Sequence, residues 1–173
     1  MKNKIVYKKE VCGYDFVKIG NFYNADVPIK AKFQGNEVEN YTLAIKLIDE
    51  KFLKAEQSAY LLFKNDEIVY AGYYSSTLLN RWFRKQGNIY YVWHGVEEKN
   101  DLKDDFIKRP EQYSLWISYN PYATKDNGEK VNISKFIEDI IISQIQPKFN
   151  KVGKKIYEEN EKSLKVVDII KSL

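Results

Sequence analysis

Two β-rich runs around a short polar turn constrain the fold of this chain most. Residues 58–63 and 68–74 are rich in apolar and aromatic side chains, and the segment between them reads Lys-Asn-Asp-Glu. Such runs joined by a polar turn are typical of an antiparallel β-hairpin. Pairing Tyr60 with Gly72 places the side chains of Tyr60 and Tyr70 on one face, whereas a slip of one residue would separate them. The sequence therefore predicts a hairpin with a defined register.

Further strands are expected on both sides of the hairpin. Short β-like runs, which would form a small sheet or arm, are found in residues 5–7, 14–19 and 28–33. Stronger strand patterns follow in residues 88–94 and 113–119. The acidic stretch 97–105 is expected to be a solvated loop or a short helix, and residues 121–132 a turn-rich loop.

Helices are expected between and after these strands. Apolar residues recur at helical spacing in residues 41–55 and 134–146. A short helix capped by Ser75 or Ser76 is expected directly after the hairpin, and a mixed-charge helix from about residue 155. The chain is therefore expected to mix helices and strands.

Composition limits the kinds of site that the chain can carry. A length of 173 residues suits one elaborated domain, and a net charge of +4 gives a mild preference for an anionic partner. With Cys12 as the sole cysteine and His94 as the sole histidine, an internal disulfide and a multi-histidine zinc site are excluded. No window reaches the roughly 18 apolar residues of a membrane span, so we expect a cytoplasmic protein without a membrane partner. Any catalysis must rest on Tyr, Arg, Lys, Glu and Asp.

The hairpin and two later segments resemble the GIY-YIG nuclease superfamily. Tyr60 stands at the tyrosine of the first motif, and Tyr70 and Gly72 stand in the second. Arg81 matches the arginine of the family's first helix, and Glu138 matches the carboxylate of a later helix. The resemblance implies nuclease activity and a divalent metal, Mg²⁺ or Mn²⁺.

The resemblance covers residues 58–153 and implies an α+β fold. Its core would be a small antiparallel sheet, made of the hairpin plus a third strand and flanked by helices, with an insert at about residues 88–130. Residues 1–57 would form an N-terminal arm and helix for DNA recognition or dimerisation, and residues 154–173 a C-terminal helix. All these parts are expected to form one compact domain.

The family pattern implies a chemical role for each motif residue. Tyr60 is the candidate general base, although a phenol has a reference pKa of about 10, and Tyr70 would support it by hydrogen bonding. Arg81 has a planar fork that suits two phosphate oxygens at once. Tyr73 follows the motif glycine and would bind the phosphate or the leaving group. The alternative is that the tyrosines fill a sheet face and Arg81 is a solvated helix residue.

Glu138 is the candidate metal ligand. On a helical wheel it lies beside Ile141, Ile142 and Ile145, so an apolar stripe carries one carboxylate. Burying an unpaired carboxylate is costly, which favours a metal ion or a guanidinium as its partner. The alternative is a glutamate at the flank of the stripe that reaches water. Asn150, at the family's spacing, would support the site structurally through backbone hydrogen bonds.

DNA contacts are expected from both basic and aromatic side chains. The basic candidates are Arg84, Lys85, Lys148, Lys151 and Lys154. The aromatic candidates, most of which we expect in the core, are Tyr90, Trp93, Trp116, Tyr119 and Tyr122.

The leading hypothesis is a Mg²⁺-dependent type II restriction endonuclease that cuts double-stranded DNA. A homodimer is expected because each active site cuts one strand and palindromic targets favour two-fold symmetry. A DNA methyltransferase would be the genetic partner. Two alternatives stay open: a structure-specific repair or mobile-element nuclease, and a nucleic-acid-binding module without catalytic activity.

Overall fold

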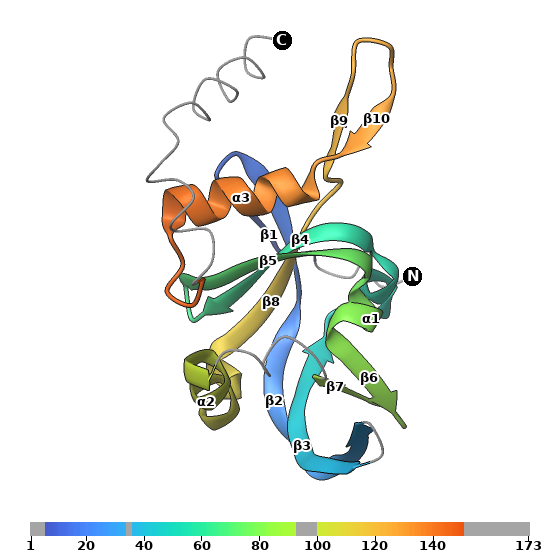
Figure 1. Cartoon of the computed structure of the whole chain (residues 1–173), viewed down its shortest axis with the longest axis vertical. Helices are drawn as coiled ribbons and strands as arrows, with labels where there is room; N and C mark the ends of the chain where they lie inside the picture. Colours follow the sequence, from blue (N-terminus) through green and yellow to red (C-terminus); the bar gives the residue numbers. More distant parts are fainter. Residues whose placement is uncertain (1–5, 34–35, 93–99, 151–173) are drawn as a thin grey trace.

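An antiparallel sheet that curls around its core dominates the fold (Figure 1). The computed structural model describes residues 6–33, 36–92 and 100–150. The eight strands of this sheet are β1 (Lys8–Val11), β2 (Tyr14–Phe33), β3 (Asn36–Leu47), β4 (Glu56–Lys64), β5 (Glu67–Thr77), β6 (Phe83–Gln86), β7 (Ile89–Val92) and β8 (Tyr113–Ser118). Their order is β5-β4-β8-β2-β3-β7-β6, with β1 paired to β2. The protein is thus a mixed α+β protein with mostly antiparallel strands.

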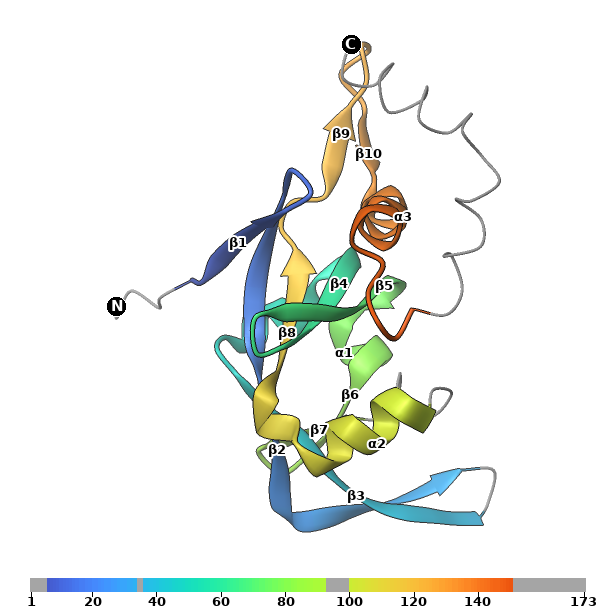
Figure 2. The same ribbon diagram turned by 90° about the vertical axis from the view of Figure 1, so that its left-hand side faces the viewer.

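The remaining elements are short. The helices are α1 (Leu78–Trp82), α2 (Asn100–Lys108) and α3 (Ser134–Ile145), with two 3₁₀ turns, η1 (Glu50–Lys54) and η2 (Pro110–Gln112). Strands β9 (Tyr122–Thr124) and β10 (Lys130–Asn132) pair as a separate hairpin that projects from the sheet (Figures 1 and 2). Within the described residues, every helix is too short or too polar to cross a membrane.

The β4–β5 hairpin has the predicted register. Tyr60 pairs with Gly72, and Leu62 pairs with Tyr70. The turn is closed by the pair Lys64 and Glu67. Strand β8 adds to β4 as the third strand, so the hairpin lies at one end of the sheet and β5 is its edge strand.

The two faces of the hairpin belong to different core clusters. Tyr60 and Leu62 join the larger cluster, which also contains Trp82 of α1. Ala59 and Leu61 point the other way and pack with Ile137 and Ile141 of α3, among others. Helices α1 and α3 therefore lie on opposite sides of the hairpin, as both views show (Figures 1 and 2).

Helix α2 is tied to the sheet through one carboxylate. Lys64 Nζ lies 2.6 Å from Asp105 Oδ2, and the Tyr113 hydroxyl and the Arg109 guanidinium also donate to Asp105. Burial raises the pKa of Asp105, but the hydrogen bonds from Lys64, Tyr113 and Arg109 outweigh it and hold the pKa well below its usual range. Asp105 thus stays ionised in the folded protein.

The helix predicted for residues 41–55 is wrong. Residues 41–47 belong to strand β3, and only the turn η1 is helical. Leu43, Ala44 and Ile45 are all buried, because residues on both faces of β3 are covered. A strand buried on both faces has a continuous apolar run, which hydrophobic spacing does not distinguish from a buried helix.

The N-terminal strands and the loop at residues 121–132 also differ from expectation. The runs at 14–19 and 28–33 belong to one strand, β2, which pairs with β8, so the expected small arm is continuous with the main sheet. The predicted loop contains the β9–β10 hairpin. Both differences arise from strand pairing, which the local sequence pattern does not specify.

Several other boundaries agree closely with the sequence pattern. Strands β7 and β8 lie in the predicted segments, α2 begins inside the acidic stretch, and α3 ends at the left-handed Gln146. The cap of α1 is Thr77, whose hydroxyl accepts from the backbone N–H of Asn80 at 3.2 Å, whereas Ser75 and Ser76 are still in extended β5. The helix expected from residue 155 lies outside the described residues.

Candidate active site

Tyr60 and Gly72 are in unusually close contact across the hairpin. A Cβ atom on residue 72 would lie 2.3 Å from both Cζ and Oη of Tyr60. Gly72 therefore leaves the space in which the Tyr60 phenol crosses strand β5. The ring is 1% exposed and lies edge-on to Trp82, with 5.1 Å between ring centroids. Packing thus fixes the position of the phenol.

The Tyr60 hydroxyl joins Arg81 and Tyr70. It is hydrogen-bonded to both side chains, and the Tyr60 and Tyr70 ring centroids are 6.0 Å apart. Burial raises the pKa of Tyr60 well above its ordinary value; Tyr70 raises it further, and the Arg81 guanidinium lowers it. The phenol is therefore neutral in this arrangement, and Arg81 is the group that opposes its protonation.

Asn150 clamps the edge of β5 next to this site. Its Oδ1 accepts from the N–H of Ala71 at 2.9 Å, and its Nδ2 donates to the Ala71 carbonyl at 2.8 Å. The N–H of Phe149 also donates to the Val69 carbonyl at 3.0 Å. The segment after α3 thus satisfies edge groups that a sheet would otherwise leave unpaired.

Glu138 lies on the other side of the hairpin from the Tyr60 ring. It belongs to α3, its side chain is 15% exposed, and Lys135 Nζ lies 2.8 Å from Glu138 Oε2. Its partner is therefore an ammonium group, and neither a guanidinium nor a metal is needed to explain its partial burial. The spacing of three residues on one helix could have revealed Lys135 from the sequence. The described residues contain no group of three or more His, Cys, Asp or Glu side chains placed to hold a metal ion.

A pocket of about 390 Å³ opens where β5 leads into α1. Tyr73, Tyr74, Ser75, Ser76, Asn80 and Arg81 line it. Tyr73 lies in register with Ala59, on the α3 side of the hairpin, whereas Arg81 contacts Tyr60 on the α1 side. Because Arg81 is cationic and the other lining groups are neutral, the pocket suits an anion. Sequence reasoning missed Ser75, Ser76 and Asn80 as lining residues, although their closeness to Arg81 in the chain was a usable signal.

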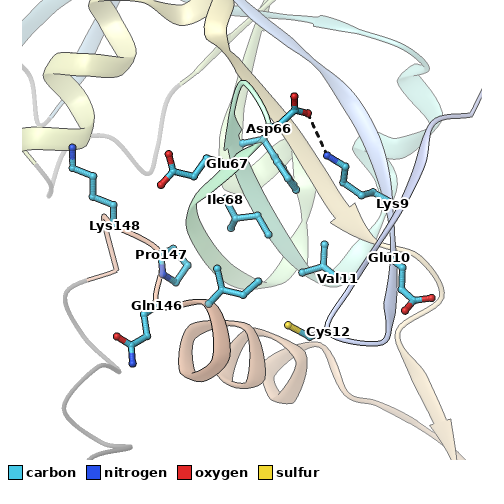
Figure 3. A pocket seen from close by; sticks show the side chains of 12 residues that line it. Lys9, Glu10, Val11, Cys12, Asp66, Glu67, Ile68, Gln146, Pro147 and Lys148 are labelled. Carbon is cyan, nitrogen blue, oxygen red and sulfur yellow. Dashed lines mark ion pairs between the residues drawn. The ribbon is translucent and has the colours of Figure 1, made fainter.

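A second pocket, of about 410 Å³, lies at the tip of the hairpin (Figure 3). Strand β1, the hairpin turn and the end of α3 surround it. Lys9 and Asp66 form an ion pair at 3.6 Å, and Glu10, Glu67 and Lys148 add charges of both signs. Mixed charge around a partly apolar floor does not favour the phosphate backbone of a nucleic acid.

The predicted basic contacts lie on separate parts of the surface. Arg84 and Lys85 are exposed on β6, and the hydrogen bond between Lys85 and Tyr90 raises the pKa of Lys85. Lys148 is exposed, with its Nζ 5.2 Å from the centre of the Phe149 ring. Lys151 and Lys154 lie outside the described residues. Tyr60 and Tyr70 therefore gather around Arg81 while Glu138 does not, and among the described basic candidates Arg84 and Lys85 belong to β6 whereas Lys148 follows α3.

The aromatic candidates for DNA contact divide by exposure. Tyr119 is 53% exposed and Tyr122 is 46% exposed, whereas Tyr90 and Trp116 are buried. The expectation that most of these rings belong to the core therefore holds for Tyr90 and Trp116 and is wrong for Tyr119 and Tyr122. Trp93 lies outside the described residues.

Comparison with known proteins adds no relative. No protein-family model, curated protein or solved structure matches this chain. A function is therefore proposed below from the hairpin and from the pocket that Arg81 lines.

Proposed function

We propose that this chain is a Mg²⁺-dependent DNA endonuclease of the GIY-YIG kind, most like the type II restriction endonucleases. The observation that carries the proposal is the hydrogen bond between Tyr60 and Arg81, made across Gly72 and beside an anion-compatible pocket. A core packing role explains the Tyr60 ring but does not explain a guanidinium bonded to a buried phenol. The guanidinium of Arg81 loses favourable hydration where it contacts the buried phenol, and binding of a phosphate would offset this loss.

Arg81 has the leading role among the residues of the chain. Its guanidinium would bind two oxygens of the phosphodiester that is cut and would stabilise the charge that develops on them. It also lowers the pKa of Tyr60, the candidate base, against the effect of burial. Tyr70 orients the Tyr60 hydroxyl, and Asn150 holds β5, the strand that carries Tyr70 and Gly72.

The residues present fit a sparse Mg²⁺ site. Mg²⁺ commonly binds one or two carboxylates, keeps several waters and completes its shell with substrate phosphate. Glu138, which forms an ion pair with Lys135 in the structure, would supply such a carboxylate. When bound, Mg²⁺ would supply Lewis-acid stabilisation of the phosphate and acidify a water molecule. Glu138 and the Tyr60–Arg81 pair lie on opposite faces of the hairpin, and Glu138 is not among the residues that line the pocket beside Arg81.

A restriction role requires a part that reads sequence. The projecting β9–β10 hairpin is exposed along β9 and its turn, and the major groove admits a two-stranded ribbon of this kind. We place recognition of double-stranded DNA there, with two copies of the chain acting on a symmetric target. A repair or mobile-element nuclease would instead obtain its targets through another subunit. A neighbouring gene for a DNA methyltransferase would favour restriction.

Digestion of long unmethylated DNA with and without Mg²⁺ tests the proposal. Discrete bands that need Mg²⁺ are expected from the wild type, and Glu138→Ala should abolish them. Arg81→Lys keeps the charge but loses the planar fork, so it should retain DNA binding and lose most cleavage. Retardation of DNA without cleavage at any Mg²⁺ concentration would overturn the nuclease proposal.

A binding module without catalytic activity is the second candidate. The burial of Tyr60, which raises its pKa, and the ion pair between Glu138 and Lys135 both favour it. Such a module would bind nucleic acid equally well in EDTA and in Mg²⁺. Its affinity would also be unchanged by Glu138→Ala, which separates it from the nuclease.

A further inference from the structure

The pocket beside Arg81 extends past the residues that the proposed chemistry uses. Within the described part of the chain, the side chains of Ser75 and Asn80 make no hydrogen bond, and both residues are exposed. The Ser76 hydroxyl reaches the carbonyl of Thr77 at 3.5 Å, the outer limit for such a bond. Three polar side chains on the pocket wall thus keep hydrogen-bonding capacity for a ligand.

The backbone of β5 adds a donor at the same place. The side chain of Asn150 forms hydrogen bonds with the N–H and the carbonyl of Ala71, which point away from β4. Backbone groups of an edge strand alternate in direction with a period of two residues, so the N–H of Tyr73 points to the same free edge. The bonds from Phe149 and Asn150 reach Val69 and Ala71, before Tyr73. The Tyr73 N–H is therefore directed to the free edge beside the pocket that Tyr73 lines.

Tyr74 also lines the pocket, with 3% of its surface exposed. Burial raises the pKa of Tyr74 well above its usual value, and a hydrogen bond with the Ser58 side chain lowers it in part. Tyr74 is therefore a neutral part of the pocket wall and brings no charge to it.

We propose that this pocket binds the phosphodiester next to the one that is cut, on the same DNA strand. The inference rests on the proposed nuclease function: Arg81 takes the scissile phosphate, and Ser75, Ser76, Asn80 and the Tyr73 N–H take its neighbour. Both sets of groups line one pocket of about 390 Å³. In this arrangement the chain binds two phosphates, one through a guanidinium and the other through neutral hydrogen-bond donors.

Neutral donors give this subsite a distinctive signature. Each cationic contact with a phosphate releases counterions and contributes about 0.9 to the slope of log affinity against log salt. Hydroxyl, amide and backbone N–H groups release none. Removing Ser75 and Ser76 should therefore weaken DNA binding by about five- to tenfold and leave the salt slope unchanged. Loss of a cation, as in Arg81→Gln, should instead reduce the slope.

The first experiment titrates inorganic phosphate into the ¹⁵N-labelled full chain. Saturable shifts are expected at the amides of Tyr73, Ser75, Ser76 and Asn80, and Ser75→Ala/Ser76→Ala should weaken them at least fivefold. Asn21→Ala, which removes an exposed amide outside the pocket, should leave them as in the wild type. Shifts that are absent, or that are equal in the double variant, overturn the subsite.

The second experiment measures binding of duplex DNA in Ca²⁺ across a series of salt concentrations, and cleavage in Mg²⁺. Weaker binding by the serine variant at unchanged slope, with KM raised more than kcat is lowered, supports the subsite. A wild type that cuts DNA and a serine variant of unchanged affinity overturn the subsite alone. A wild type that never cuts DNA overturns the nuclease function, and the phosphodiester subsite falls with it.

Discussion

Replacing Gly72 with alanine tests the central contact of the site. The added methyl carbon would lie 2.3 Å from Cζ and Oη of Tyr60, far inside van der Waals contact. The phenol cannot simply turn aside, because it is 1% exposed and lies edge-on to Trp82. Overpacking of this kind typically lowers the free energy of unfolding by 1–3 kcal/mol. Because the ring cannot move, we expect the upper end of that range, about 3 kcal/mol. For a chain of this size, that is a fall in Tm of about 6–12 °C.

A double-mutant cycle assigns this cost to the Tyr60 ring. Urea unfolding of Gly72→Ala, Tyr60→Leu and the double variant gives the coupling free energy between the two positions. Leucine lacks the far end of the phenol, so alanine at position 72 should cost less than about 1 kcal/mol in that background. Tyr60→Phe is the matched control: it removes the hydroxyl but keeps Cζ, so the clash with alanine should remain.

The reasoning is refuted by either of two results. A cost below about 0.5 kcal/mol for Gly72→Ala would show that no close contact exists. An equal cost in the wild-type and Tyr60→Leu backgrounds would show that glycine is needed for backbone reasons and not for the phenol. Activity adds a separate readout, because a displaced Tyr60 also loses its hydrogen bond to Arg81.

Three further predictions follow from contacts elsewhere in the structure. The pKa of Asp105 is lowered in the folded protein, so its contribution to stability is fully present above its unfolded pKa near 4 and is lost as pH falls through the folded pKa. Urea unfolding at a series of acidic pH values should show this fall in the free energy of unfolding, and Asp105→Asn should reduce the pH dependence. Asn150→Ala leaves the buried N–H of Ala71 without its partner and should cost about 2–3 kcal/mol by urea unfolding, whereas a cost near zero would refute the clamp. Thr77→Ala should cost about 1 kcal/mol by the same assay as a lost helix cap, and Ser76→Ala should cost much less; the reverse order would show that Ser76 is the cap.

The parts of the fold that the sequence predicts are those decided by local patterns. The hairpin register follows from alternating side chains around a polar turn, and α3 follows from its apolar stripe and the proline beyond its end. Strand β3 escapes prediction because both its faces are buried: Leu43 and Ile45 join the larger core cluster, and Ala44 packs with Ala25 and Tyr91 on the other face. Those partners are distant in sequence, so no local window contains the information that decides the strand.

The candidate site is predicted from sequence to the extent that its residues share one hairpin. Tyr60, Tyr70 and Gly72 are brought together by the hairpin alone, and Arg81 follows within one short helix. The partner of Glu138 was expected to be a metal or a guanidinium, and the structure places Lys135 there. Lys135 stands three residues before Glu138 on α3, a spacing that brings side chains together on a helix and is visible in the sequence, whereas the metal partner stays a prediction.

The edge position of β5 explains how one site can draw on two faces of a sheet. Within a sheet, side chains from opposite faces are separated by the backbone, so Tyr60 and Glu138 would not meet in its interior. Beyond β5, the edge strand, no backbone separates the two faces. The pocket there is lined both by Tyr73 from the α3 side and by Arg81 from the α1 side. Asn150 covers the edge at Ala71 and leaves the following residues open. An anion in that pocket would therefore be within reach of Arg81 from one face and of Tyr73 from the other.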